Sequence, residues 1–114
     1  MEPIYELQAS VLRMLANPRR LEMLHALTDG PMEVGRIAQR LGISQPNASQ
    51  HLALLRQAGL VEIERNGREV RYQLTDPEVM VACSIMRGFL QRRIDRLSTV
   101  AVANERSAPV GANA

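Results

Sequence analysis

A run of short polar side chains in the middle of the chain is the part of this sequence best suited to hydrogen-bond recognition. Amide and hydroxyl groups occur at Gln45, Asn47, Ser49 and Gln50, and an imidazole follows at His51. Asn and Gln can donate and accept at once, and they can bind adenine through two hydrogen bonds at its major-groove edge. These five residues are therefore candidates for contacting DNA, and the alternative interpretation is a polar face that contacts only solvent.

Two arginines form a second candidate site. Arg65 and Arg68 flank Asn66-Gly67, a dipeptide typical of two-residue type I′ hairpin loops because both of its residues accept a positive φ. A guanidinium group binds phosphate well and is attracted into a narrow minor groove. We therefore expect both arginines to contact DNA from a hairpin tip. Weaker candidates for contacts to the DNA backbone are Arg36, Arg40 and Arg56.

The charge distribution agrees with these two sites. All 14 basic residues are arginines, and 12 acidic residues leave a net charge of +2. Residues 1–35 carry −2, residues 36–75 carry +3 and residues 76–114 carry +1, so the excess falls on the segment that holds both sites. A net charge this small does not indicate a polybasic tail. With no Trp, two Tyr and one Phe, there is also little material for stacking single-stranded bases.

The spacing of apolar residues and the positions of Gly and Pro predict the helices and strands that position these residues. Helices are predicted over about residues 4–16, 18–28 and 33–41. The second helix is expected to turn Leu21, Leu24 and Leu27 toward the core. Asn17 is suited to cap the second helix, and Gly42 is suited to end the third. Ser44 supplies the hydroxyl of an N-cap for a fourth helix that ends at Ala58-Gly59. This hydroxyl is also a candidate for contacting DNA, through a phosphate. Two helices joined by a short turn that contains Gly are typical of a helix-turn-helix.

The period then changes from 3.6 to 2, which predicts a β-hairpin over about residues 61–74. With Asn66-Gly67 as the loop, Ile63 lies opposite Val70 and Arg65 lies opposite Arg68, which puts the apolar side chains on one face. A last helix is expected from Pro77 with an apolar stripe to about Leu97. The predicted fold is mainly α with a small β-hairpin wing, a winged helix-turn-helix in the order α-α-α-α-β-β-α.

The predicted domain organisation is one winged helix-turn-helix domain for DNA binding and dimerisation over residues 1–97, followed by a flexible C-terminal tail over residues 98–114. A chain of this length forms a single domain by the usual size range, and its core is small enough for a partner subunit to help stabilise it. The first and last helices carry apolar stripes broader than one small core needs. We therefore expect them to pair across a two-fold axis.

Three stretches resemble the ArsR/SmtB family of bacterial winged-helix repressors, and the resemblance covers about residues 7–97. They are Leu15-Ala16-Asn17-Pro18-Arg19-Arg20-Leu21, Ile43-Ser44-Gln45-Pro46-Asn47-Ala48-Ser49-Gln50-His51-Leu52 and Arg65-Asn66-Gly67-Arg68-Glu69-Val70-Arg71-Tyr72. The second stretch is the most specific. The resemblance implies a homodimer that binds a palindromic operator and is released by an effector, which the resemblance does not identify. It also implies that His51 lies in the DNA-facing helix.

The metal ligands of this family are not matched by the sequence. Relatives that bind soft ions carry Cys-Val-Cys or Cys-Val-Gly on the third helix, where this chain has Glu33-Val34-Gly35 without a thiolate. A second family site uses acids and histidines along the last helix, and the corresponding positions here are Asp76, Glu78, Phe89 and Arg92. Because a ring and a cation replace two ligands, we predict no metal site and no cofactor. Asp76 is expected to help cap the last helix.

A thiol sensor is the remaining chemical possibility. Redox-responsive and persulfide-sensing relatives use one Cys on the second helix and one on the last, and the corresponding positions here are His25 and Leu90. The one cysteine of the chain, Cys83, lies about two turns before Leu90 on the apolar stripe. It is interpreted either as a small buried apolar residue or as a redox-reactive thiol that is oxidised or pairs across a dimer. His25 is interpreted as a partly exposed residue without a sensing role.

The sequence thus predicts a homodimeric transcriptional repressor whose partners are double-stranded operator DNA and a second copy of itself, and which is not an enzyme. We expect a cytoplasmic location without membrane contact, because no signal-peptide pattern and no long apolar run occur. Three alternatives stay open. They are a repressor that senses thiol chemistry through Cys83, a repressor that binds DNA constitutively or responds to a small organic effector, and a winged-helix module for protein or RNA contacts.

Overall fold

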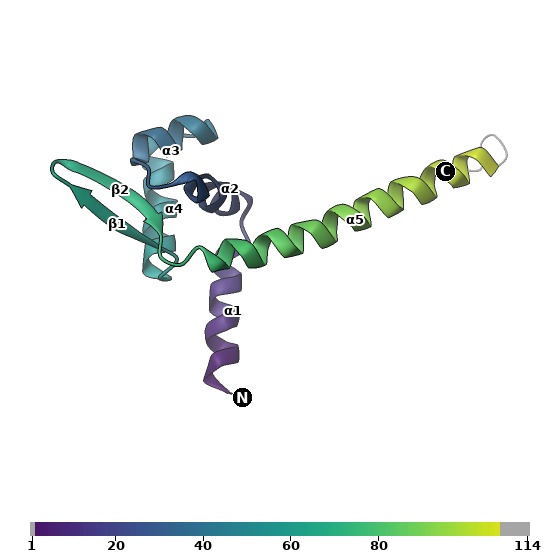
Figure 1. The fold of residues 1–114 in the computed structure, drawn as a ribbon, viewed down its shortest axis with the longest axis horizontal. Helices are drawn as coiled ribbons and strands as arrows, with labels where there is room; N and C mark the ends of the chain where they lie inside the picture. The colour runs from purple at the N-terminus through teal and green to yellow at the C-terminus, as the bar shows by residue number, and fades with distance from the viewer. Residues whose placement is uncertain (1, 108–114) are drawn as a thin grey trace. The chain divides into compact units, whose positions relative to one another are not determined.

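The computed structural model describes the backbone of residues 2–107 and the side chains of residues 2–100. Its elements are α1 (Pro3–Leu15), α2 (Pro18–Ala26), the short 3₁₀ helix η1 (Leu27–Asp29), α3 (Val34–Leu41), α4 (Gln45–Gln57), β1 (Val61–Asn66), β2 (Glu69–Leu74) and α5 (Glu78–Ser107). Figure 1 shows the hairpin of β1 and β2 beside α3 and α4. The chain divides into two compact parts, one up to Met80 and one from Val81 onward. The predicted mainly α, winged helix-turn-helix order is confirmed.

Side-chain caps and one glycine set the helix ends, as the sequence predicts. The Asn17 side-chain oxygen accepts from the Arg20 backbone N–H at 3.1 Å, and the Ser44 hydroxyl oxygen accepts from the Asn47 N–H at 3.2 Å. Each bond satisfies one of the N–H groups that a helix start leaves without a helical partner. Gly42 ends α3 with φ of 68°, a left-handed conformation that glycine adopts without a Cβ penalty. These signals fix the short turn between α3 and α4.

The core of the first part lies between α2, η1, α3, α4 and the base of the hairpin. Its largest fully buried side chains are Met23, Leu24, Ile37, Leu52, Leu55 and Val61. The prediction that Leu21 turns toward the core is wrong, because 38% of this residue is exposed while Met23 is fully buried. Leu24 and Leu27 are buried as predicted, so the buried face of α2 is centred on Met23, Leu24 and Leu27.

The hairpin pairs in a different register from the predicted one. Ile63 lies opposite Tyr72, Glu64 opposite Arg71 and Arg65 opposite Val70. The turn is Gly67-Arg68 rather than Asn66-Gly67, because only Gly67, with φ of 64°, adopts a positive φ there. A glycine at the first central position is typical of a type II′ turn. Ile63 shifts by two residues along β2, from Val70 to Tyr72, so the apolar side chains stay on the predicted face.

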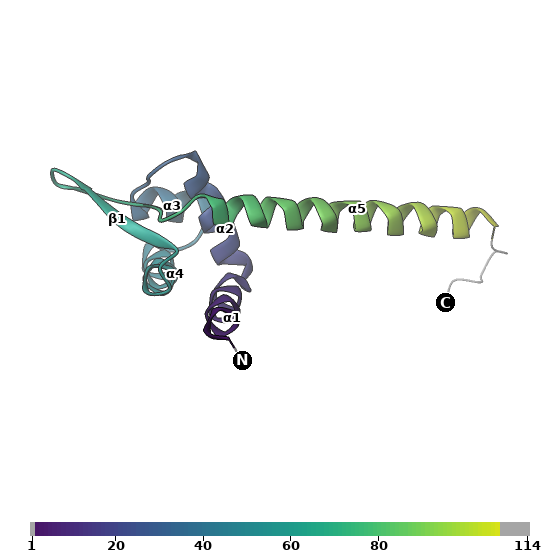
Figure 2. The same ribbon diagram turned by 60° about the horizontal axis from the view of Figure 1, so that its bottom comes forward.

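A backbone bridge ties the hairpin to the segment before α3. The Met32 N–H donates to the Tyr72 carbonyl at 3.0 Å, and the Tyr72 N–H donates to the Met32 carbonyl at 2.7 Å. β2 therefore has β1 on one edge and Met32 on the other. Figure 2 shows that the far end of the hairpin projects past the helices. The bridge holds the base of the hairpin against the helix-turn-helix while its tip stays exposed.

The last helix is longer than predicted. α5 continues to Ser107, so the tail expected from residue 98 is helical over residues 98–107, and residues 108–114 of that tail lie outside the described residues. The Thr99 hydroxyl donates to the Asp95 carbonyl one turn earlier at 2.9 Å. Large apolar side chains of α5 from Val81 to Val100 are exposed in the single chain. In the described part of the chain, no helix is long and apolar enough to cross a membrane.

Candidate DNA interface

The first two turns of α4 present polar side chains outward because apolar side chains fix the opposite face. Ala48, Leu52 and Leu55 are fully buried, and with a helical period of 3.6 the intervening positions must face away from the core. Gln45, Asn47, Ser49 and Gln50 are accordingly exposed. The structure thus places four of the candidate base-reading residues at exposed positions in the N-terminal half of α4. Recognition helices contact base edges with residues in this N-terminal half.

Ser44 and Gln45 are constrained at the start of α4. The Ser44 hydroxyl is used as the N-cap, although this exposed hydroxyl can still donate. The side-chain oxygen of Gln45 lies about 3.5 Å from the position that a Cβ at Gly35 would occupy. A glycine within α3 lowers helix stability, and here it leaves space beside Gln45. Gln45 therefore lies beside α3, whereas Gln50 is five residues further along α4.

His51 lies at the edge of this surface and is half-buried. Its Nδ1 is buried and has no hydrogen-bond partner among the described residues. If this nitrogen carried the ring proton, its buried N–H would have no acceptor and would lose a full hydrogen bond to water. Nε2 is therefore the ring nitrogen assigned as a hydrogen-bond donor.

The hairpin tip presents both predicted arginines to solvent. Arg65 lies in β1 opposite Val70, and Arg68 lies in the turn, and both side chains are exposed. Because side chains alternate along a strand, Arg65 extends from the same face as Val61 and Ile63. The glutamates of the hairpin lie on the other face together with Arg71. The two faces of the wing therefore carry opposite charge near the tip.

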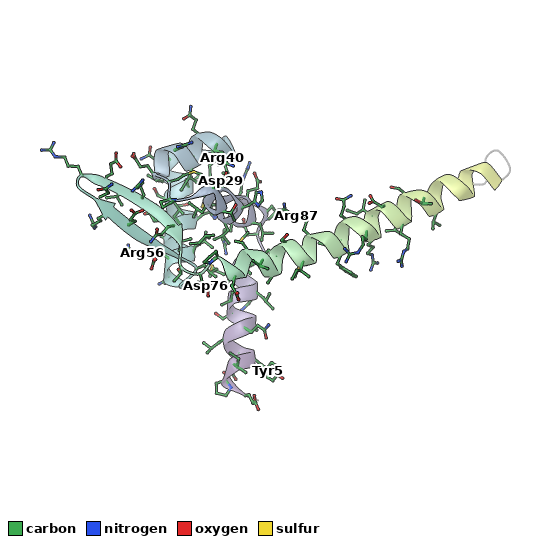
Figure 3. The ribbon with its side chains drawn as sticks, viewed as in Figure 1. Tyr5, Asp29, Arg40, Arg56, Asp76 and Arg87 are labelled. Atoms are coloured by element: carbon green, nitrogen blue, oxygen red, sulfur yellow. The ribbon has the colours of Figure 1, made fainter. Side chains whose placement is uncertain are left out.

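The three weaker arginine candidates have different surroundings. Arg40 binds Asp29 through Nη2 and Oδ2 at 2.7 Å, and Figure 3 shows these two side chains beside each other. Arg56 is exposed in the last turn of α4, where a positive charge also stabilises the helix dipole. Arg36 is exposed at a surface pocket of about 420 Å³ that it shares with Glu33 and Glu69. Of these three, only Arg40 makes an ion pair with a described side chain.

An ion pair on the hairpin is the feature that the sequence reasoning missed. Arg71 Nη2 lies 3.0 Å from Glu64 Oε1, and Glu62 accepts from the Gln73 amide at 3.0 Å beside it. The predicted register instead placed Glu64 opposite Glu69 and Arg65 opposite Arg68, two repulsive pairs. Like charges opposite each other destabilise a sheet. The charge pattern therefore favours a loop one residue later, at Gly67-Arg68 instead of Asn66-Gly67.

The candidate sensing residues belong to other elements than α4 and the hairpin. Cys83 is partly buried on α5, and His25 is exposed on α2. The Asp76 side chain accepts from the Glu78 backbone N–H at 2.9 Å, which confirms the predicted role of Asp76 at the start of the last helix. Among the residues that the structure describes, no group of three or more His, Cys, Asp or Glu side chains is arranged to hold a metal ion.

The chain is similar to a known protein family and to several individual proteins. The model of the bacterial regulatory protein arsR family matches residues 17–62, from the cap of α2 into β1. The HTH-type transcriptional regulator Rv0081 of Mycobacterium tuberculosis is 32% identical over 101 residues, which cover 87% of this chain and 89% of the regulator. Its crystal structure matches with a TM-score of 0.74 over 85% of this chain and 99% of that one.

Two further proteins are similar over the winged region. The biofilm growth-associated repressor of Xylella fastidiosa is 41% identical over 68 residues, and the match spans 60% of this chain and 60% of the repressor. The solution structure of a homodimeric winged helix-turn-helix DNA-binding domain from Mycobacterium bovis, a possible ArsR-family regulator, is 31% identical with a TM-score of 0.70. That match covers 77% of this chain and 82% of the other.

Proposed function

Because the chain belongs to the ArsR family of bacterial transcriptional regulators, we propose that it is a homodimeric repressor that binds a palindromic operator and releases it when an effector arrives. The observation that carries this proposal is the exposed polar surface on the first two turns of α4, beside a hairpin whose tip carries two exposed arginines. The proposal assigns the chain to the cytoplasm, where operator DNA lies, and gives it no catalytic role.

We assign the base-reading role to Gln45, Asn47, Ser49 and Gln50. Their amide and hydroxyl groups match the donors and acceptors at the edges of bases in the major groove. Arg65 and Arg68 are assigned to the phosphates or the minor groove beside that site, and His51 to a donor contact through Nε2. Arg36 and Arg56 remain weaker candidates for phosphate contacts, and Arg40 is weaker still because Asp29 already binds it.

The homodimer is supported by apolar surface that the single chain leaves uncovered. None of the thirteen residues of α1 is buried, and Ile4, Tyr5 and Leu7 are each about 60% exposed. α5 exposes a further set of large apolar side chains between Val81 and Val100. Covering such surface with a second copy removes it from water, which is the main favourable term in association. Deletion of residues 1–16 should give a monomer in analytical ultracentrifugation, and a deleted chain that stays dimeric would contradict the role of α1.

The experiment that tests DNA binding is selection of bound sequences from a pool of random duplexes by the full chain. A dimer of recognition helices predicts an enriched palindrome whose half-sites lie about 34–36 Å apart, which is one helical turn of DNA. Fluorescence anisotropy then compares the enriched duplex with a mixed-sequence duplex. Absence of enrichment, or equal affinity for both duplexes, would contradict the proposal and favour a protein- or RNA-binding module.

Thiol sensing through Cys83 is the second candidate, and the observation that favours it is that this residue on α5 is only partly buried. Oxidation of Cys83, or its pairing with the same residue across a dimer, would then change the affinity for the operator. Cys83→Ser should abolish any response of operator binding to peroxide or polysulfide. If the variant and the wild-type chain respond alike, or if neither responds, thiol sensing is wrong and a constitutive repressor or a small organic effector is favoured.

A further inference from the structure

We propose that Glu64 is a positioning residue that withholds Arg71 from DNA and so limits the phosphate contacts of the hairpin to Arg65 and Arg68. This inference rests on the proposed function, because it concerns how the wing binds DNA. It assigns a role in DNA affinity to an acidic residue that would not itself contact DNA. The partner that the pair excludes is the phosphate backbone of a duplex.

The pair is built into the hairpin. Glu64 and Arg71 lie directly opposite each other in the register of β1 and β2, and their charged groups meet at 3.0 Å. Only 29% of the Arg71 side chain and 34% of the Glu64 side chain are exposed, so solvent screens this pair less than it screens a fully exposed one. Two strands hold the partners in place, which reduces the side-chain entropy lost on pairing.

Two unsatisfied atoms belong to this same pair. Arg71 Nε and Glu64 Oε2 are both buried and lack a hydrogen-bond partner in the described part of the chain. Arg and carboxylate groups commonly form two parallel N–H to O bonds, and a second bond from Nε to Oε2 would satisfy both atoms at once. The pair therefore has two donors, Nη2 and Nε, and two acceptors, Oε1 and Oε2, for a pair of parallel hydrogen bonds. Two such bonds would fix the direction of the guanidinium as well as its position.

The ion pair reduces the number of hairpin arginines that can contact phosphate. Three arginines lie within seven residues at the hairpin end, and only Arg71 makes an ion pair with a described side chain. Arg71 lines a surface pocket with Glu33 and Glu69, but only Glu64 makes an ion pair with it. Without Glu64, the half-buried guanidinium would lose its paired carboxylate and become available to a nearby phosphate. One more phosphate contact for each protomer raises affinity for every sequence and makes binding more sensitive to salt.

The test compares Glu64→Gln with Glu62→Gln. Both changes remove one negative charge from the same face of β1, but Glu62 pairs with the neutral Gln73, so only Glu64→Gln frees an arginine. Binding of the full chain to a fluorescein-labelled mixed-sequence duplex is measured by anisotropy across a salt series. Thermal unfolding followed by circular dichroism shows whether each variant is folded.

The expected result is a steeper salt dependence for Glu64→Gln only. The slope of log K against log salt should steepen by about 0.9 per protomer and about 1.8 per dimer. The ratio of the affinity of Glu64→Gln to that of Glu62→Gln should therefore fall about 12-fold between about 50 and 200 mM salt. The double variant with Arg71→Gln should return to the slope of Glu62→Gln. Equal slopes for Glu64→Gln and Glu62→Gln would overturn the inference.

A second variant keeps the inference testable if Glu64→Gln does not fold. Arg71→Gln should leave the wild-type salt slope unchanged, because the paired Arg71 makes no phosphate contact. A slope flattened by about 0.9 per protomer would show that Arg71 already contacts phosphate, and the inference would be wrong. A wild-type chain that binds no duplex would instead contradict the proposed function.

Discussion

Gln50 and Gln57 are the same residue type on the same helix, and both are exposed. Gln50 lies in the N-terminal half of α4, the half through which recognition helices contact bases, whereas Gln57 is the last residue of the helix. Gln50→Ala should remove about 1–3 kcal/mol of discrimination at one base pair of each half-site. Anisotropy with the selected duplex and with duplexes changed at single positions measures this loss. Gln57→Ala should keep the wild-type discrimination, and an equal effect of both changes would contradict base reading by Gln50.

Arg68 differs from Gln50 in the kind of contact that it is expected to make. A phosphate contact carries no sequence information, so Arg68→Ala should lower affinity for all duplexes by the same factor and leave discrimination unchanged. The salt slope should flatten by about 0.9 per protomer. Arg13→Ala removes the same charge from the exposed polar face of α1 and is the control for long-range electrostatics. A sequence-dependent loss with Arg68→Ala would instead assign this residue to base or groove-shape recognition.

The positions of these side chains were predictable because each follows from a local rule. Burial of Ala48, Leu52 and Leu55 sets which residues of α4 are exposed, and this pattern is present in the sequence alone. The Glu64 and Arg71 pair was not predicted because it depends on cross-strand register, and the apolar pattern is identical for a shift of two residues. Charge pairing, rather than hydrophobicity, distinguishes the two registers.

At the scale of elements, α4 depends on the hydroxyl of Ser44. Ser44→Ala leaves the Asn47 N–H without its side-chain acceptor and should lower the free energy of unfolding by about 1 kcal/mol. Urea denaturation followed by circular dichroism measures this change at fixed protein concentration. Ser49→Ala alters the same residue type on the exposed face of the same helix and should be nearly neutral or slightly stabilising. A cap role would be disproved by equal stability of the two variants.

Element ends were predicted well where a cap or a glycine marks them and poorly where neither does. Asn17, Gly42 and Ser44 fix their helix ends within one residue of the predicted positions. The end of α5 has no such marker, and the small and polar residues after Leu97 are also compatible with a helix, since alanine has the highest helix propensity. The bridge between Met32 and Tyr72 was missed because a single pair of residues forms no alternating pattern.

At the scale of the whole molecule, the described chain combines a winged core that buries its apolar side chains with two helices whose large apolar side chains are mostly exposed. The buried residues of the described chain all lie between Met23 and Met80. α1 and the part of α5 beyond Met80 contribute none of them, although both carry many large apolar side chains. Full burial of one such side chain contributes about 1.5–3 kcal/mol. Loss of the dimer should therefore leave a folded wing and helix-turn-helix with weakened DNA binding, since one half-site contact is lost.

Leu90→Glu tests this division without deleting any part of the chain. Leu90 is exposed in the single chain and shares the apolar face of α5 with Met86 and Leu97, whereas Ser84 falls on the opposite face. A glutamate in an apolar contact with its own two-fold copy would bury two unpaired like charges, so Leu90→Glu should be monomeric in sedimentation velocity. The monomer should keep its helical circular dichroism signal and bind a palindromic duplex no more tightly than a single half-site.

Ser84→Glu adds the same charge and should stay dimeric. A dimeric Leu90→Glu chain that binds the full palindrome as the wild type does would show that α5 does not form the dimer contact, and the exposed apolar residues of α1 would then be the next candidate.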